Sequence, residues 1–152
     1  MKPLKDLSKD LLAATQDGLQ EAAEAVGKEL VMQSPLWYGD FSDSWVIRIN
    51  ADRPILNNKP ERKDRKWNTQ PTAVRGRPPI APRIRSVEKG YRIGNRMEYA
   101  GFATDEIPVK QNLFRGDRKG ATAPKFWFQK YARFDIDKDL EQGFNASLSR
   151  YF

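Results

Sequence analysis

The stretch LKDLSKDLLAATQDGLQEAAEAVGKELVM, residues 4–32, decides the fold because it predicts one long amphipathic helix. Apolar side chains recur along it at spacings of three, four and seven residues, as on one face of a helix. These are Leu4, Leu7, Leu11, Leu12, Leu19, Val26 and Leu30. The alanines between them favour helix and allow close approach of a neighbour, while Gly18 and Gly27 indicate a bend or a crowded crossing. Ser34-Pro35 ends the helix, since a residue before proline avoids helical geometry.

Downstream of this helix the pattern changes to that of short strands. Residues 44–50 alternate, with Trp45, Ile47 and Ile49 on one face, which is typical of a half-buried strand. Residues 84–87 and 91–93 predict a second pair of strands joined by a turn at 88–90, and Gly94-Asn95 predicts another turn.

The final segment, residues 124–150, predicts a second helix or a broken pair of helices. Pro124 suits a first helical position, and Asp135 suits the cap of a second helical piece. Aromatic side chains are dense at 126–134 and predict part of the core, to which we assign Trp45, Tyr99 and Phe126. The predicted fold is therefore α+β, with the N-terminal and C-terminal helices packed on a small, mainly antiparallel sheet.

Length and composition indicate a single domain spanning residues 1–152, without a membrane span. The chain has no cysteine, which excludes disulfides and thiolate metal sites. It has no histidine either, which removes the commonest general base and the commonest metal ligand. We therefore predict a protein that is not an enzyme and carries no cofactor. Carboxylate-only hydrolysis remains the enzymatic alternative, with Asp40 or Asp43 as its candidate residue.

The net charge of +7 is concentrated in residues 51–85, where Lys and Arg outnumber Asp and Glu by ten to three. Six of the ten prolines lie within residues 51–82, and apolar periodicity disappears there. Such a segment cannot bury enough apolar surface to offset its ordering entropy. We interpret residues 51–82 as a basic, proline-rich arm, an extended insertion or long hairpin that projects from the core and becomes ordered against a partner.

The arm supplies the candidate partner-binding residues. Its cations suit phosphates or an acidic protein face, and Trp67 suits stacking or packing. The candidates are Arg53, Lys59, Arg62, Lys63, Arg65, Lys66, Trp67, Arg75 and Arg77. Proline stiffening and the absence of base-reading motifs favour a protein partner over nucleic acid. The alternatives are a nucleic-acid-binding module that uses the arm as an electrostatic clamp, and a solvated loop that contacts no partner.

Two further groups of residues have ordinary structural explanations. The series Asp135, Asp137 and Asp139 has the spacing of a calcium loop but lacks its glycine and closing glutamate, so helix capping explains it better. The aromatic residues at 37–45 and 126–128 are expected to form core, with a subunit interface or a ligand cage as the alternatives.

Three stretches together resemble the tail-completion and neck proteins of tailed bacteriophages, the minor tail protein Z group. Gly39-Asp40-Phe41-Ser42-Asp43-Ser44-Trp45 is similar to the turn that leads into the first strand of that family. Ile93-Gly94-Asn95, followed by Glu98-Tyr99-Ala100-Gly101-Phe102-Ala103, resembles a central segment, and Ala123-Pro124-Lys125-Phe126 resembles the entry to the last helix. The order of helix, strands and final helix is similar too.

The resemblance implies a structural virion protein at the head–tail junction, assembled in the host cytoplasm. It implies a homo-oligomeric ring, a hexamer or alternatively a dodecamer, that contacts the tail tube or tail terminator and portal or adaptor proteins. Basic residues facing a central channel would also contact packaged DNA without reading its sequence.

Overall fold

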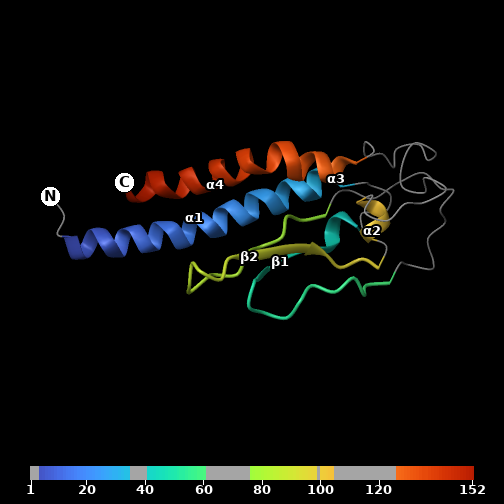
Figure 1. Ribbon diagram of the computed structural model, residues 1–152, viewed down its shortest axis with the longest axis horizontal. Helices are drawn as coiled ribbons and strands as arrows, with labels where there is room; N and C mark the ends of the chain where they lie inside the picture. The colour runs from blue at the N-terminus through green and yellow to red at the C-terminus, as the bar shows by residue number, and fades with distance from the viewer. Residues whose placement is uncertain (1–3, 35–40, 61–75, 99, 105–125) are drawn as a thin grey trace.

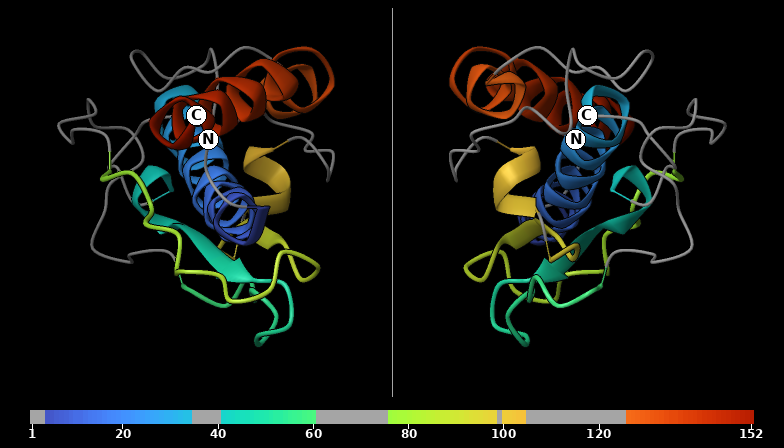
Figure 2. Two further views of the ribbon diagram at one scale, coloured as in Figure 1. Left: turned by 90° about the vertical axis from the view of Figure 1, so that its left-hand side faces the viewer. Right: turned by 90° about the vertical axis from the view of Figure 1, so that its right-hand side faces the viewer.

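The computed structural model describes residues 4–34, 41–60, 76–98, 100–104 and 126–152. These residues form three layers, with the N-terminal helix α1 between a two-stranded sheet and the C-terminal helix α4 (Figure 1). The end-on views in Figure 2 show the same order of layers. The elements are α1 (Leu4–Gln33), a 3-10 turn (Ser42–Ser44), β1 (Trp45–Ile49), β2 (Tyr91–Asn95), α2 (Ala100–Ala103), α3 (Trp127–Lys130), a π-helical turn (Tyr131–Asp135) and α4 (Ile136–Tyr151). The predicted α+β class is confirmed.

Helix α1 ends where the sequence predicted, immediately before Ser34. The Ser34 hydroxyl donates a hydrogen bond to the Leu30 carbonyl and accepts one from the Trp45 indole N–H, so the helix end is tied to the start of β1. Val26 and Leu30 lie in the core, whereas Leu7, Leu11 and Leu12 are exposed. The α1 residue that meets Ser147 near the end of α4 is Ala14, so the first turns of α1 extend beyond α4.

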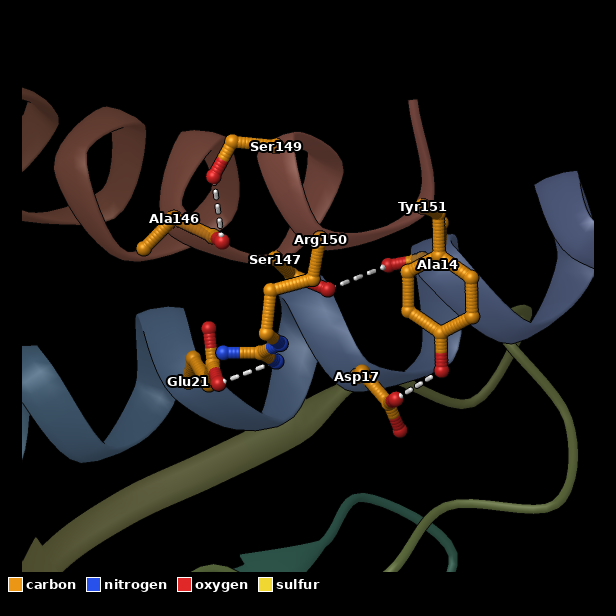
Figure 3. Close-up of polar contacts among 8 residues, drawn as sticks. All are labelled: Ala14, Asp17, Glu21, Ala146, Ser147, Ser149, Arg150 and Tyr151. Atoms are coloured by element: carbon orange, nitrogen blue, oxygen red, sulfur yellow. Dashed lines mark hydrogen bonds and ion pairs between the residues drawn. The ribbon is translucent and has the colours of Figure 1, made fainter.

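Small residues let α1 and α4 pack closely along their length. Ala14, Ala22 and Ser147 are buried between the helices, and the Ser147 hydroxyl donates to the Ala14 carbonyl at 3.1 Å (Figure 3). A Cβ on Gly143 would lie 2.8 Å from the Ala22 Cα, and one on Gly18 would lie 2.7 Å from the Phe144 ring. The predicted crowded crossing at Gly18 is thus confirmed.

Polar pairs flank this interface at its solvent edge. Arg150 forms an ion pair with Glu21, and the Tyr151 hydroxyl donates to Asp17 (Figure 3). The hydrogen bond to Asp17 raises the pKa of Tyr151. Because water still reaches and screens these partly exposed groups, they contribute less to stability than the packing beside them.

The sheet is antiparallel, with Ile47 opposite Ile93 and Arg48 opposite Arg92. Trp45 and Ile47 point towards α1 and are buried, as the predicted alternation requires. A Cβ on Gly27 of α1 would lie 3.1 Å from the Ile47 Cδ1. Glycine therefore allows the helix to lie directly against the sheet.

The predicted strand at 84–87 is wrong, although the turn that follows it is present. Residues 81–85 obtain hydrogen bonds from side chains of α1. Gln20 donates to the Ala81 carbonyl and Gln16 to the Arg85 carbonyl, while the Ala81 N–H donates to Glu24. The segment therefore lies along α1, and β2 pairs with β1 instead.

The predicted turn at Gly94-Asn95 is also wrong, because both residues belong to β2. Asn95 is buried, and its side-chain amide donates to the Phe41 carbonyl while its amide oxygen accepts from the Met97 N–H. A Cβ on Gly94 would lie 3.1 Å from Ile55. The Asn95 side chain therefore bonds β2 to the backbone at Phe41 and Met97, and Gly94 leaves room for Ile55.

The C-terminal helix begins differently from the prediction. Pro124 lies outside the described residues. Phe126, the residue immediately before α3, has a left-handed backbone with φ 60° and is exposed, so its assignment to the core is wrong. Asp135 makes no capping hydrogen bond, because a π-helical turn joins α3 and α4 into one continuous rod. Tyr99 also lies outside the described residues.

Candidate interaction surface

Of the nine predicted partner-binding residues, the structure describes Arg53, Lys59 and Arg77. Arg53 and Arg77 are exposed. Lys59 is half-buried and its ammonium group donates to the Ser44 hydroxyl at 2.9 Å, so this side chain already contacts the domain. The other six, Arg62, Lys63, Arg65, Lys66, Trp67 and Arg75, lie outside the described residues.

The two described ends of the arm pack on the domain and do not project from it. At residues 51–60, Asn57 donates to the Asn95 carbonyl, and Lys59 pairs through its backbone with the strand-like segment at Met97. At residues 76–82, the Gly76 N–H donates to the Ser42 hydroxyl, and Ala81 is buried against α1 and β1. The predicted boundaries of the arm are therefore too wide, and residues 61–75 are the part left between these two anchored ends.

The outer face of the sheet carries cations that the sequence analysis did not select. Arg48 and Arg92 lie directly opposite each other, and the exposed Arg96 follows directly after β2. Like charges opposite each other on a sheet are destabilising by about 0.2–1 kcal/mol. Arg48 donates to the carbonyls of Arg53 and Pro54, and Arg92 donates to Asn50, so these partners hold the side chains in place. The sequence contained a signal for them, because Arg48 alternates with Ile47 and Ile49, and Arg92 alternates with Tyr91 and Ile93.

The sheet layer and helix α1 have net charges of opposite sign. In the described residues 41–60 and 76–98, which form the sheet layer, Lys and Arg outnumber Asp and Glu by nine to four. In α1, Asp and Glu outnumber Lys and Arg by six to three. Pro60 and Gly76, the described residues on either side of the basic segment 61–75, both belong to this layer. The arrangement suits a binding surface for an anionic partner.

Among the described residues, the candidate catalytic carboxylate does not lie in a pocket suited to catalysis. Asp43 is exposed and accepts a long hydrogen bond from the Arg77 N–H, while Asp40 lies outside the description. A cavity of about 370 Å³ beside β2 is lined by Trp45, Phe128, Arg92 and Glu98, among others, but not by Asp43. Within the described segments, no cluster of three acidic side chains is suited to hold a metal ion. No helix in those segments is both long and apolar enough to span a membrane.

Four described members of the aromatic group pack in the core, whereas Phe126 is exposed. Trp127 packs edge-on against Phe41 and Trp45 with ring centroids 6.3 and 6.5 Å apart, and its indole N–H donates to the Ala103 carbonyl. Phe128 stacks on Trp45 at 6.2 Å. The core interpretation is confirmed for these four residues. Trp37 and Tyr38 lie outside the described residues, and Phe134 is 69% exposed, contrary to its predicted place in the core.

Because of the buried Tyr131, we expect the protein to lose stability at alkaline pH. Its side chain is buried, and its hydroxyl donates to Asp139 at 2.7 Å. Burial raises the pKa of Tyr131 well above its ordinary value of 10.0, and the Asp139 carboxylate raises it further. Below about pH 10 the phenol is neutral in both folded and unfolded chains. Above that pH the unfolded chain gives up its proton first, so stability falls by up to about 1.4 kcal/mol per pH unit for this group.

We expect Tyr131→Phe to flatten that alkaline loss while costing about 1.5–3 kcal/mol at neutral pH through the missing hydrogen bond to a charged group. Chemical denaturation between pH 7 and about pH 11 measures both effects. Tyr151→Phe is the comparison: the pKa of Tyr151 is raised too, by its hydrogen bond to Asp17, but its side chain is less buried, so this variant should flatten the alkaline loss less than Tyr131→Phe does. Equal alkaline slopes for wild type and Tyr131→Phe would contradict the assignment.

Comparison of the chain with family models, curated proteins and solved structures gives no match. The resemblance to tail-completion and neck proteins therefore stays a prediction based on three short motifs.

Proposed function

We propose that this chain is a structural subunit of the head–tail junction of a tailed bacteriophage. In this proposal it is a virion protein that forms a ring, connects or seals the neck and tail, and does not catalyse a reaction. Its neighbours are the tail tube or tail terminator and the portal or adaptor proteins. The observation that carries the proposal is a strongly basic insertion with both ends fixed to a compact domain.

The anchoring matters because it gives residues 61–75 defined starting and ending positions. Lys59 is held beside Met97, just after β2, and Gly76 is held at the turn before β1. Between them lie five Lys and Arg, two acids and Trp67. A tether held at both ends loses less entropy on binding than a free chain, so the insertion suits repeated docking to a neighbouring subunit.

A ring also fits the charge of the sheet layer. Subunits that contact one another head to tail close into a ring when their rotation closes. Where the basic sheet layer or the insertion faces the central channel, it would attract DNA phosphates without sequence preference.

A second candidate function is a nucleic-acid-binding module, favoured by Arg48 and Arg92, which lie opposite each other on the sheet, and by Arg96 directly after β2. It requires DNA or RNA binding by the isolated protein that weakens steeply with salt. The excess of Asp and Glu in α1, the layer behind the sheet, makes this the weaker candidate.

The test replaces residues 61–75 with a glycine–serine linker of equal length. We expect the free energy of unfolding to change by about 0.5 kcal/mol or less, as for surface changes, while joining of heads and tails is lost. Electron microscopy of particles from the host, with this subunit labelled, should place the wild-type protein at the junction. It should show separated heads and tails for the variant.

The matched control, Glu61→Gln/Asp64→Asn, alters the same segment but keeps its cations, so joined particles should persist. Unfolding of the linker variant would mean that the insertion belongs to the core. A label located elsewhere on the particle, or a monomer that turns over a small substrate, would refute the proposed function.

A further inference from the structure

Successive residues of β2 direct their backbone groups to opposite edges of the strand, as in any antiparallel pair. The Asn50 N–H donates to the Gly90 carbonyl, and the Arg96 N–H donates to the Ser44 carbonyl. Because both bonds keep the register of the sheet, the even-numbered residues of β2 bond to β1. The odd-numbered residues therefore direct their N–H and C=O groups to the outer edge of β2: Tyr91, Ile93 and Asn95.

Part of this outer edge is free to pair with a further strand. The Asn95 carbonyl accepts a hydrogen bond from the Asn57 side chain. Within the described segments, the backbone N–H and C=O groups of Tyr91 and Ile93 on this edge have no hydrogen-bond partner. An edge strand with such groups is a template on which another extended segment can pair.

A groove follows the same edge. The cavity of about 370 Å³ beside β2 is lined by residues from both faces of the strand, and we call it the edge groove. On the face towards α1 its lining is apolar, with Ile93 beside the stacked rings of Trp45 and Phe128. On the outer face it is lined by Arg92 and by Ile55, which packs over Gly94. Its volume is within the usual range for a binding pocket, about 300–1,000 Å³.

The outer side of the edge groove is basic. Arg92 is exposed and lies opposite Arg48, so two like charges face each other across the strands. Glu98, a carboxylate that also lines the groove, lies beyond the end of β2 near α2. An acidic side chain on a strand added beside Arg92 would replace part of the repulsion with attraction, since opposite charges on neighbouring strands are favourable.

We propose that the edge groove binds an extended peptide of a partner protein, in which apolar and acidic side chains alternate, and adds it to the sheet as a third strand. The peptide backbone bonds to Tyr91 and Ile93. Because alternate side chains of a strand point to opposite faces, the apolar ones lie against Trp45 and Phe128, and the acidic ones face Arg92. The edge groove goes beyond the proposed function and does not depend on it.

A peptide fits these observations better than a nucleic acid or a second copy does. Phosphates would be attracted to Arg92, but a nucleic acid would leave the Tyr91 and Ile93 backbone groups unpaired. Pairing with β2 of a second copy would satisfy those groups. It would also bring a second pair of arginines onto a face that is already basic, which is unfavourable.

The first experiment measures binding of a short, fluorescein-labelled synthetic peptide in which valine and aspartate alternate. Fluorescence anisotropy at about 0.1 M salt should show saturable binding. The same peptide with lysine in place of aspartate should bind about 10-fold or more weakly, because lysine then faces Arg92.

Charge reversal in the protein should invert this preference. Arg92→Glu should weaken binding of the aspartate peptide about 10-fold and strengthen binding of the lysine peptide. Lys89→Glu is the control, since it changes the net charge equally at an exposed turn position that does not line the groove. We expect it to change both affinities by about twofold or less. Circular dichroism and thermal unfolding check that both variants keep the fold.

Two N-methylated peptides separate strand pairing from charge attraction. One carries methyl groups on the valine nitrogens and the other on the aspartate nitrogens, and both keep the parent charge. Successive N–H groups of a strand point to opposite edges, so only one of the two sets faces β2. One peptide should therefore bind about 10-fold or more weakly than the parent, and the other should bind like the parent.

Amide hydrogen exchange, followed by NMR, locates the bound strand. In the free protein the Ile93 N–H should exchange faster than the N–H groups of Arg92 and Gly94, which bond to β1. A saturating amount of the aspartate peptide should slow exchange at Ile93 about 10-fold or more, with a smaller change at Arg92 and Gly94.

The inference is overturned by a wild type that does not bind the aspartate peptide at concentrations up to about 1 mM. Equal binding of the aspartate and lysine peptides, equal binding of the two N-methylated peptides, or an Ile93 N–H already protected in the free monomer would overturn it too. Duplex DNA binding that Arg92→Glu removes, without peptide binding, would assign the arginines to phosphates. Self-association that protects the Ile93 N–H would assign the edge to a second copy. Each of these results leaves the proposed function standing, whereas a subunit absent from the head–tail junction refutes that function and leaves the edge groove standing.

Discussion

Replacement of Trp127 by alanine is expected to lower the free energy of unfolding by about 3–5 kcal/mol. The side chain is 2% exposed and packs against Phe41, Trp45 and Phe128. Alanine leaves a cavity in this group and removes the donor to the Ala103 carbonyl. Since a domain of this size is stable by about 5–15 kcal/mol, the loss is a large share of the total.

Chemical denaturation followed by tryptophan fluorescence and circular dichroism measures this change. Phe134→Ala is the matched control, because it removes an aromatic side chain from the neighbouring π-helical turn where the ring is exposed. We expect the control to change stability by about 0.5 kcal/mol or less. Similar losses for both variants would show that Trp127 does not hold the core together.

Gly143→Ala is expected to destabilise the protein by about 1–3 kcal/mol, although the same change in an exposed helix stabilises by about 1 kcal/mol. The added Cβ would lie 2.8 Å from the Ala22 Cα and 2.9 Å from both the Ala22 nitrogen and the Glu21 carbonyl oxygen. These are backbone atoms, so α4 must move away from α1 as a whole. Bulkier residues at this position should cost more.

Asn145→Ala is the control for this substitution, since it lies two residues further along α4 at an exposed position. We expect it to leave stability unchanged or raise it slightly, because alanine is the better helix former. Thermal and chemical denaturation of both variants measure the change in the free energy of unfolding. A Gly143→Ala protein that is more stable than the wild type would mean that the helices are further apart than described.

Periodicity in the sequence predicted the elements that bury a regular face. The residues from Leu4 to Leu30 predicted α1, and the alternation at Trp45, Ile47 and Ile49 predicted β1. Both signals are local, because each depends on side chains within a single element. The confirmed parts of the prediction are of this kind.

The errors arose where tertiary contacts override local preference. Gly94 and Asn95 have turn-forming side chains, yet Ile55 and the Phe41 carbonyl hold them in a strand. The backbone at Ala81 is bonded by Gln20 and Glu24 of α1, from about 60 residues away, so no strand forms there. These partners come from distant parts of the chain, so the residue pattern within a single element does not reveal them.

The candidate surface was predicted in part. Composition revealed the basic insertion, and its charge does not depend on the fold. The pairing of Arg48 with Arg92 depends on strand register, which joins residues on either side of the insertion. The series Asp135, Asp137 and Asp139 was assigned to helix capping and to complementing the helix dipole. Asp135 makes no capping bond, whereas Asp137 and Asp139 lie in the first turn of α4, where they complement the dipole.

The pairing of the first and last helices has a consequence for biosynthesis. Helix α1 ends at Gln33 and its main partner α4 starts at Ile136, about 100 residues later. At about 5–20 residues per second, a ribosome needs roughly 5–20 s to make the residues between them. During that interval the alanine-rich side of α1 has no α4 to cover it. The nascent chain therefore depends on chaperones, or on the solubility of its charged side chains, until translation of α4 is complete.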